Sequence, residues 1–95
     1  MKLISITKSS NPDKKYMAVF QTDTGTRKTT HFGAAGMSDF TIHKDPERKR
    51  LYLIRHKKNE NWNDPTSAGS LSRYVLWNKP TLKASIDDFK KRFRL

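Results

Sequence analysis

A change of hydrophobic pattern around Gly33 constrains the fold of this chain more than any other feature. Before it, turn residues separate three short segments rich in β-branched residues, at 2–7, 15–22 and 27–32. After it, apolar residues recur at helical spacing. Two hairpins in succession form a meander, so the sequence predicts an α+β fold: a three-stranded antiparallel β-meander followed by two or three packed α-helices.

Capping residues indicate where the first long helix begins. Asp45 is of a residue type that favours the N-cap, Pro46 suits the first helical position, and Glu47 falls in the first turn, where acids are favoured. These signals predict a helix that starts at Pro46 and ends near Lys58. Within it, Leu51 and Ile54 are three residues apart, and we expect them to contact the core.

Two further helices are predicted over 70–79 and 81–93. In the first, Leu71, Tyr74 and Val75 share one face. The second carries the clearest apolar stripe of the chain, at spacings i, i+4, i+7 and i+11: Leu82, Ile86, Phe89 and Phe93. We expect this stripe to face the sheet.

The length of 95 residues predicts one domain, spanning 1–95. The chain has no cysteine, so it has neither disulfides nor thiolate metal ligands. No segment approaches the about 20 apolar residues of a membrane span, and the first residues lack the apolar run of a signal peptide. We therefore expect an intracellular protein that is not secreted.

Charge is the strongest functional signal. The formal net charge is +11, and residues 46–95 carry +8 of it. Such a balance favours nucleic acid, an anionic membrane surface or an acidic protein surface as partner. The simpler alternative is that the charge serves solubility alone.

Motifs of catalysis and cofactor binding are missing from the sequence. Gly33 and Gly36 follow a strand, but the Gly-Lys-Ser/Thr of a phosphate-binding loop is absent, so we interpret these glycines as a turn. The three histidines lack metal-ligand spacing. Asp87 and Asp88 point about 100° apart on a helix and are expected to pair with neighbouring cations. We predict no catalytic, cofactor-binding or metal-binding residue, and no enzyme.

Basic and aromatic residues in the second half are the candidate contacts with nucleic acid or another partner. On the helix that starts at Pro46, Arg48, Tyr52 and Arg55 form a stripe of charge around a ring that could lie on phosphates with the ring against a base. The alternative is that Tyr52 packs inward and the arginines are solvated. The complete predicted set is Arg48, Lys49, Tyr52, Arg55, Lys57, Lys58, Trp62, Arg73, Lys90, Lys91 and Arg92.

Two blocks of sequence resemble a known family. The string HFGAAGMSDFTIHKDPERKRLYLIRHKKNENW and the later LWNKPTLKASI are similar to small basic proteins encoded by large double-stranded DNA viruses of algae and amoebae. The resemblance spans about residues 14–95. That family has no established function, so the resemblance implies a viral origin, with the protein in the virion or in the cytoplasm or nucleus of the infected cell, and assigns no residue roles.

The resemblance and the charge support two functions. In the viral setting, we expect a virion structural component, such as a minor capsid or cement protein, that contacts other virion proteins such as the major capsid protein. Aromatic residues such as Trp62 and Trp77 would anchor it. The alternative is a DNA- or RNA-binding protein that contacts phosphates through its basic helical half. The sequence gives no oligomeric state.

Overall fold

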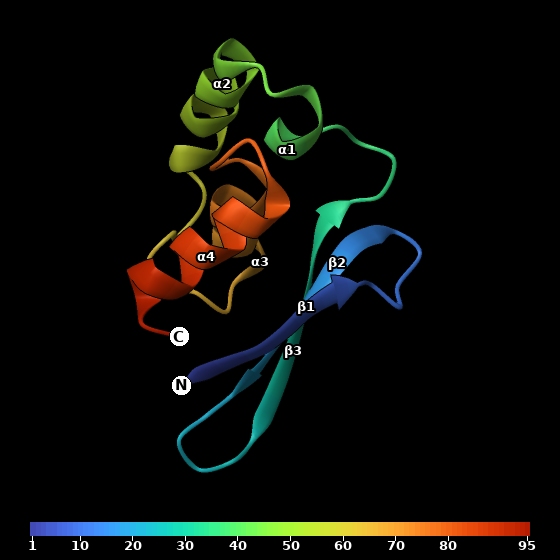
Figure 1. The fold of residues 1–95 in the computed structure, drawn as a ribbon. Coiled ribbons are helices and arrows are strands. Elements are labelled where there is room, and N and C mark those ends of the chain that lie inside the picture. The colour runs from blue at the N-terminus through green and yellow to red at the C-terminus, as the bar shows by residue number, and fades with distance from the viewer.

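A computed structural model describes all residues, 1–95, and confirms the α+β class. Three strands are followed by the helical elements (Figure 1). In chain order the elements are β1 (Lys2–Lys8), β2 (Lys14–Gln21), β3 (Arg27–Ala34), α1 (Phe40–His43), α2 (Pro46–Lys57), α3 (Ala68–Leu71), the π-helical turn η1 (Ser72–Leu76) and α4 (Leu82–Phe93). No helix is long and apolar enough to cross a membrane.

The three strands form the predicted antiparallel meander, in the order β1-β2-β3. A bulge at Ile4 shifts the register of β1, and lysines stand at both ends of that edge strand. The edge of β3 is covered by the 60–67 loop, where the Thr30 hydroxyl donates to the Thr66 carbonyl at 2.7 Å. Bulges, lysines and covering loops keep sheet edges from pairing with other chains.

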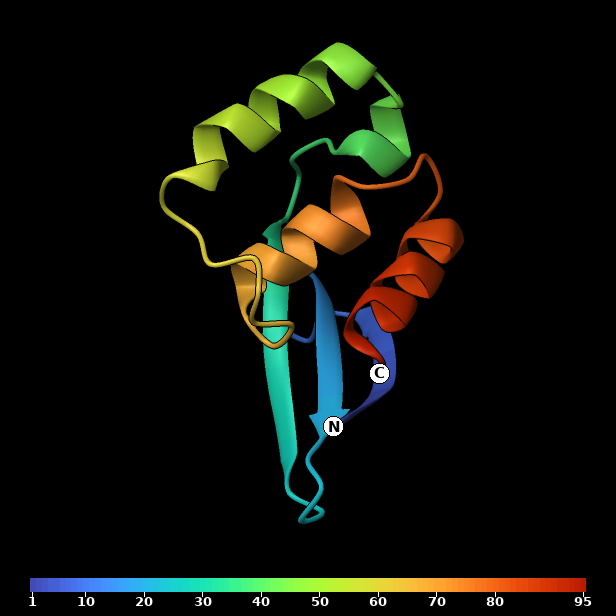
Figure 2. The same ribbon diagram turned by 90° about the vertical axis from the view of Figure 1, so that its left-hand side faces the viewer.

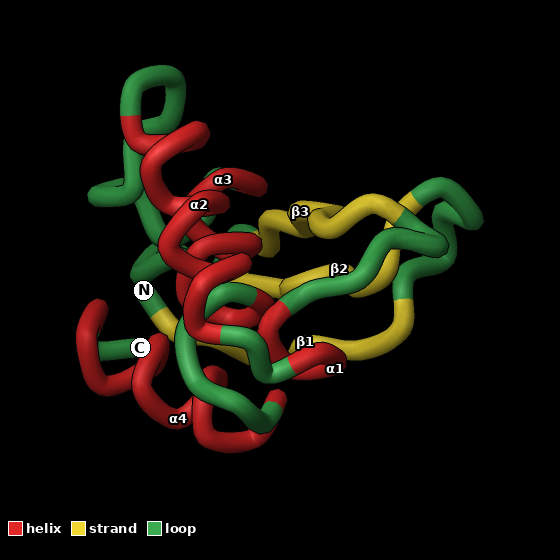
Figure 3. The backbone as a smooth tube through the Cα atoms, turned by 90° about the horizontal axis from the view of Figure 1, so that it is seen from above, coloured by secondary structure: helices red, strands yellow, loops and turns green.

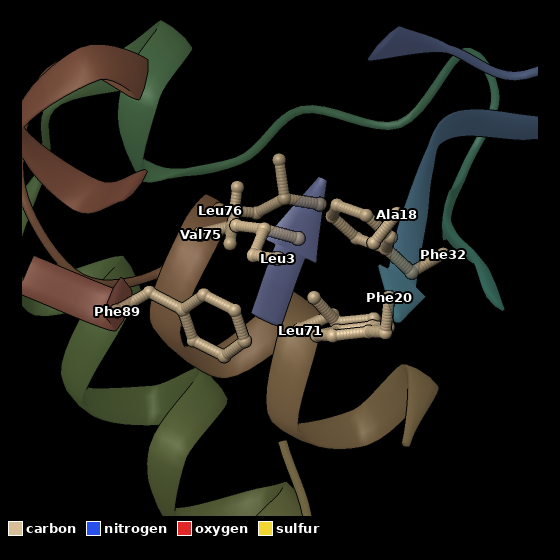
Figure 4. Packing of buried hydrophobic residues seen from close by; sticks show 8 residues of the cluster. All are labelled: Leu3, Ala18, Phe20, Phe32, Leu71, Val75, Leu76 and Phe89. Carbon is tan, nitrogen blue, oxygen red and sulfur yellow. The ribbon is translucent and has the colours of Figure 1, made fainter. Parts of the chain in front are cut away.

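The core lies between the sheet and the helices, which gather on one side of it (Figure 3). Alternation along β2 places Ala18 and Phe20 on the inner face, fully buried. Eight buried hydrophobic residues from the strands, α3, η1 and α4 meet there (Figure 4): Leu3, Ala18, Phe20, Phe32, Leu71, Val75, Leu76 and Phe89.

Helix α4 confirms the clearest helical prediction. The Thr81 hydroxyl caps it by accepting from the Ala84 amide, and Phe89 is fully buried. The rest of the stripe, Leu82, Ile86 and Phe93, is half-buried against the core. The expected ion pairs of Asp87 and Asp88 are also present. The Lys83 ammonium lies 3.8 Å from the Asp87 carboxylate, and the Arg92 guanidinium lies 3.4 Å from the Asp88 carboxylate.

The predicted start of α2 is correct, but its predicted core face is wrong. Asp45 caps the helix at the Glu47 and Arg48 amides, and Pro46 is the first residue. Leu51 and Ile54, however, are 46% and 54% exposed, whereas Tyr52 is only 7% exposed. Helix α2 lies at the top of the molecule, above α3 rather than against the sheet (Figures 1 and 2). It packs inward through the face that carries Tyr52.

The chain between β3 and α2 contains one helix that the sequence pattern missed. Helix α1 is a single turn, capped by the buried carboxylate of Asp39, which accepts from the Thr41 amide. Lys15 pairs with the same carboxylate at 2.5 Å. Four residues are too few to give a periodic hydrophobic pattern, so the sequence did not reveal this turn. It is held by the cap at Asp39 and by the ion pair between Asp39 and Lys15 of β2.

Candidate functional site

Most of the positive charge has no acidic partner within the protein. Of the twenty lysines and arginines, four form ion pairs with carboxylates: Lys15, Arg50, Lys83 and Arg92. Several acids instead serve local structure, such as Asp45 at the N-cap of α2 and Asp64 at the Thr66 amide. The cations without partners therefore present their charge to solvent or to an anion.

Helix α2 and its C-cap residue, Lys58, carry four such cations, all from the predicted set: Arg48, Arg55, Lys57 and Lys58. They are exposed and form no ion pair. Arg50, on the same helix, pairs with Glu47, and this hydrogen bond raises the pKa of Arg50 and lowers that of Glu47. Arg48 and Arg55, at i and i+7, follow one strip of the helix, and Lys58 is the C-cap residue at its end. This strip is the least neutralised surface of α2.

Lys49 is engaged in intramolecular contacts. Its ammonium donates to the Asn78 carbonyl at 2.8 Å and lies 5.1 Å from the centre of the Phe40 ring. Burial, with Arg73 and Lys79 nearby, lowers the pKa of Lys49. This predicted contact residue joins α2 to the segment before α4.

Arg73 and Trp62 also contact each other rather than an external partner. The Arg73 guanidinium lies 5.5 Å from the Trp62 ring centre and 4.9 Å from that of Tyr74, and it donates to the Trp77 carbonyl at 2.9 Å. The Trp62 indole donates to Glu60 at 3.0 Å. Burial lowers the pKa of Arg73. These contacts fold the 60–67 loop onto the helices.

Tyr52 packs inward, which is the second of the two alternatives that the sequence left open. Its ring is stacked on Trp77, with centres 4.2 Å apart and planes at 4°, and on His56 at 4.1 Å and 25°. Burial raises the pKa of Tyr52 to about 12. The ring is therefore closed to a base lying on the exposed strip of α2.

The second basic cluster is separate from α2. Lys90 and Lys91 are exposed at the end of α4, while Arg92 pairs with Asp88 and lies 4.7 Å from the Tyr74 ring centre. Figure 2 shows α4 and the C-terminal end of α2 on opposite sides of α3 and η1. The predicted residues thus form two basic surfaces rather than one.

A cleft of about 370 Å³ lies between α2, α3 and the adjoining ends of β2 and β3. Arg55 and His56 line it from α2, and Lys14 and Gly33 line it from the strands. Lys14 was missed by sequence reasoning, because it lies in the less basic half and only the fold brings it towards α2. The cleft joins unpaired cations from segments far apart in the chain.

The glycine segment forms one wall of this cleft and has the geometry of a turn. Gly33 and Gly36 have φ of +77° and +80°, backbone angles that residues other than glycine rarely adopt. A Cβ on Gly33 would lie 2.7 Å from a methyl group of Leu76. Gly33 is therefore required both for the backbone and for packing. No three histidine or acidic side chains lie close enough together to hold a metal ion.

Comparison with known proteins gives a family and no function. A family model described as "Family of unknown function (DUF5754)" matches residues 4–56, which include the whole sheet except its first residues, α1 and nearly all of α2. No curated protein and no solved structure matches the chain.

Proposed function

The chain belongs to this family of unknown function, and we propose that it is a non-enzymatic nucleic-acid-binding protein that contacts phosphates through α2. The observation that carries the proposal is the set of unpaired, exposed cations on that helix: Arg48, Arg55, Lys57 and Lys58. Their spacing along one helix suits a polyanion with regularly spaced charges better than a single small anion.

The physical basis is counterion release. Each lysine or arginine that neutralises a phosphate frees a condensed cation from the nucleic acid, so affinity falls steeply with salt. The exposed cations of α2 are not held by carboxylates, so binding breaks no internal ion pair. Contacts of this kind position the protein on the backbone and read no sequence.

The tryptophans proposed as anchors for a virion protein also have roles within the fold. Trp62 lies against Arg73 and Trp77 is stacked on Tyr52, so each of these rings already makes a contact within the fold.

A second candidate, the virion structural component, is favoured by a different observation. Leu51 and Ile54 are exposed on α2, and Ile42 and Met37 are exposed close to its start in sequence. Exposed apolar side chains among cations suit an acidic protein surface with an apolar centre. In the viral setting that the sequence resemblance implies, a minor capsid or cement protein would bind other virion proteins through these exposed apolar side chains.

The test is the salt dependence of binding to a duplex DNA oligonucleotide. Wild-type protein should give a slope of log K against log salt near −0.9 for each phosphate contacted. The double variant Arg48→Ala, Arg55→Ala should flatten this slope by about two units and weaken all sequences alike. Lys2→Ala with Lys8→Ala removes the same charge from β1 and is the matched control.

A double α2 variant that binds DNA with the slope and affinity of this control would reject the proposal. The second candidate, a virion structural component, predicts that the double α2 variant binds DNA like the control. In that case Leu51→Ser with Ile54→Ser would release the protein from purified virion shells, and DNA binding would be weak for every variant.

A further inference from the structure

We propose that the cleft between α2, α3 and the ends of β2 and β3 holds one unpaired base of single-stranded nucleic acid, with the flanking phosphates on Arg55 and Lys14. This inference rests on the proposed function and extends it, because the exposed strip of α2 would bind any phosphate backbone, whereas the cleft would select unpaired strands.

The size and lining of the cleft suit a single base. Its volume of about 370 Å³ is at the lower end of small-ligand pockets, which run from about 300 to 1,000 Å³. Phe32 and Leu76 lie beneath it with almost no exposed surface, and its exposed apolar lining comes from Met37, Ala68 and Trp77. Ser38 and Ser72 supply hydroxyl groups. The apolar surface can pack against the faces of a base, and the hydroxyl groups can form hydrogen bonds with its polar edge.

A column of three rings forms one side of the cleft. His56 is stacked on Tyr52, which is stacked on Trp77, and all three line the cleft. Glu60 fixes the His56 ring through Nδ1 at 2.9 Å and also accepts from the Trp62 indole. Single-stranded nucleic acids bind proteins by stacking bases on exposed rings beside a basic groove. Tyr52 is enclosed between the other two rings, so the half-exposed His56 and Trp77 are the rings of the column that a base can contact.

The two free cations of the cleft stand on different elements. Arg55 comes from α2 and Lys14 from the start of β2; both are exposed, and neither pairs with a carboxylate. The neighbouring Lys15 is different, since Asp39 holds its ammonium. A nucleic-acid strand that places a base in the cleft would therefore contact one cation from α2 and one from β2.

Duplex nucleic acid cannot use this arrangement. In a duplex, each base is stacked and paired, and moving it out of the helix costs a few kcal/mol. An unpaired strand offers its base faces without that cost. The cleft thus predicts a preference for single strands that the α2 cations alone would not give.

The experiment compares two substitutions of exposed alanines by phenylalanine. Ala68→Phe would fill the cleft from α3 without changing charge, and Ala84→Phe adds the same ring to α4 outside the cleft. We expect Ala68→Phe to weaken binding of a short oligothymidine or oligouridine about tenfold, the effect of one stacked base, and to leave duplex binding unchanged. Ala84→Phe should change neither. Comparing the two oligonucleotides shows whether DNA or RNA is preferred.

A photochemical measurement makes the test independent of the variants. Oligonucleotides that carry 5-bromouracil should cross-link wild-type protein at His56 or Trp77. Cross-links confined to the outer strip of α2, or equal single-strand affinities for both alanine variants, would overturn the cleft proposal while leaving phosphate binding by α2 intact. Absence of all nucleic-acid binding would instead reject the proposed function itself.

Discussion

The rings of Tyr52 and Trp77 lie parallel, 4.2 Å apart, and join α2 to the segment that follows η1. The two residues are far apart in the sequence, and only the tertiary fold brings their rings into contact. This contact sets which face of α2 is buried, and Arg48 and Arg55 flank the buried ring as exposed side chains. The surface that we propose for nucleic acid is thus positioned by an aromatic contact beneath it.

Truncating Tyr52 should therefore destabilise the protein strongly. Tyr52→Ala should lower the free energy of unfolding by about 3 kcal/mol or more, as for other buried aromatic residues. Tyr52→Phe keeps the ring and should cost much less. Urea denaturation measures both, and equal, small losses for the two variants would show that the stack does not hold α2 in place.

Phe89 should be equally sensitive, because it is the fully buried residue of α4. Phe89→Ala should cost about 3–5 kcal/mol, a large part of the stability of so small a domain. The adjacent, exposed Lys90 provides the control, and Lys90→Ala should leave the thermal midpoint nearly unchanged. An unchanged midpoint for Phe89→Ala would mean that α4 is not docked in solution.

The two glycines after the sheet should differ in their tolerance of a side chain. Both have positive φ, so alanine at either costs about 1–2 kcal/mol in backbone strain. At Gly33 the new Cβ would also overlap Leu76, whereas nothing lies within 4 Å at Gly36. Gly33→Ala should therefore be the more destabilising by at least about 1 kcal/mol, measured by urea denaturation. Equal losses would contradict the close packing against Leu76.

Leu51 and Ile54 should contribute little to folding, contrary to what their spacing predicts. Because both are about half exposed, Leu51→Ser and Ile54→Ser should each change the unfolding free energy by about 0.5 kcal/mol or less. A loss above about 2 kcal/mol for either, measured in urea, would show that this face of α2 is buried in solution.

Stability should fall in acid partly through Asp88. The Asn78 amide donates to its carboxylate at 2.7 Å, and this bond lowers the pKa of Asp88 below its ordinary value of 3.8. The contribution is thus fully present above about pH 4 and is lost as the pH falls through the lower, folded-state pKa. Asp88→Asn should make unfolding free energy less dependent on pH between about 5 and 2. An unchanged dependence would show that the bond is not maintained.

Interactions within a few residues of each other were readable from the sequence. The turn residues between the β-branched segments predicted the antiparallel meander, the Asp45-Pro46 pair predicted the start of α2, and the stripe with Phe89 predicted the docked face of α4. Each signal acts over one strand or a few helical turns. The α+β class follows from these local signals.

The buried face of α2 and the cleft were decided by tertiary structure alone. The apolar spacing of Leu51 and Ile54 predicted one face, but the position of Trp77 after η1 selected the face of Tyr52. Likewise, Lys14 and Arg55 line one cleft only because β2 and α2 approach each other across the fold. Contacts of this kind depend on where whole elements pack, and no spacing within a single element encodes them.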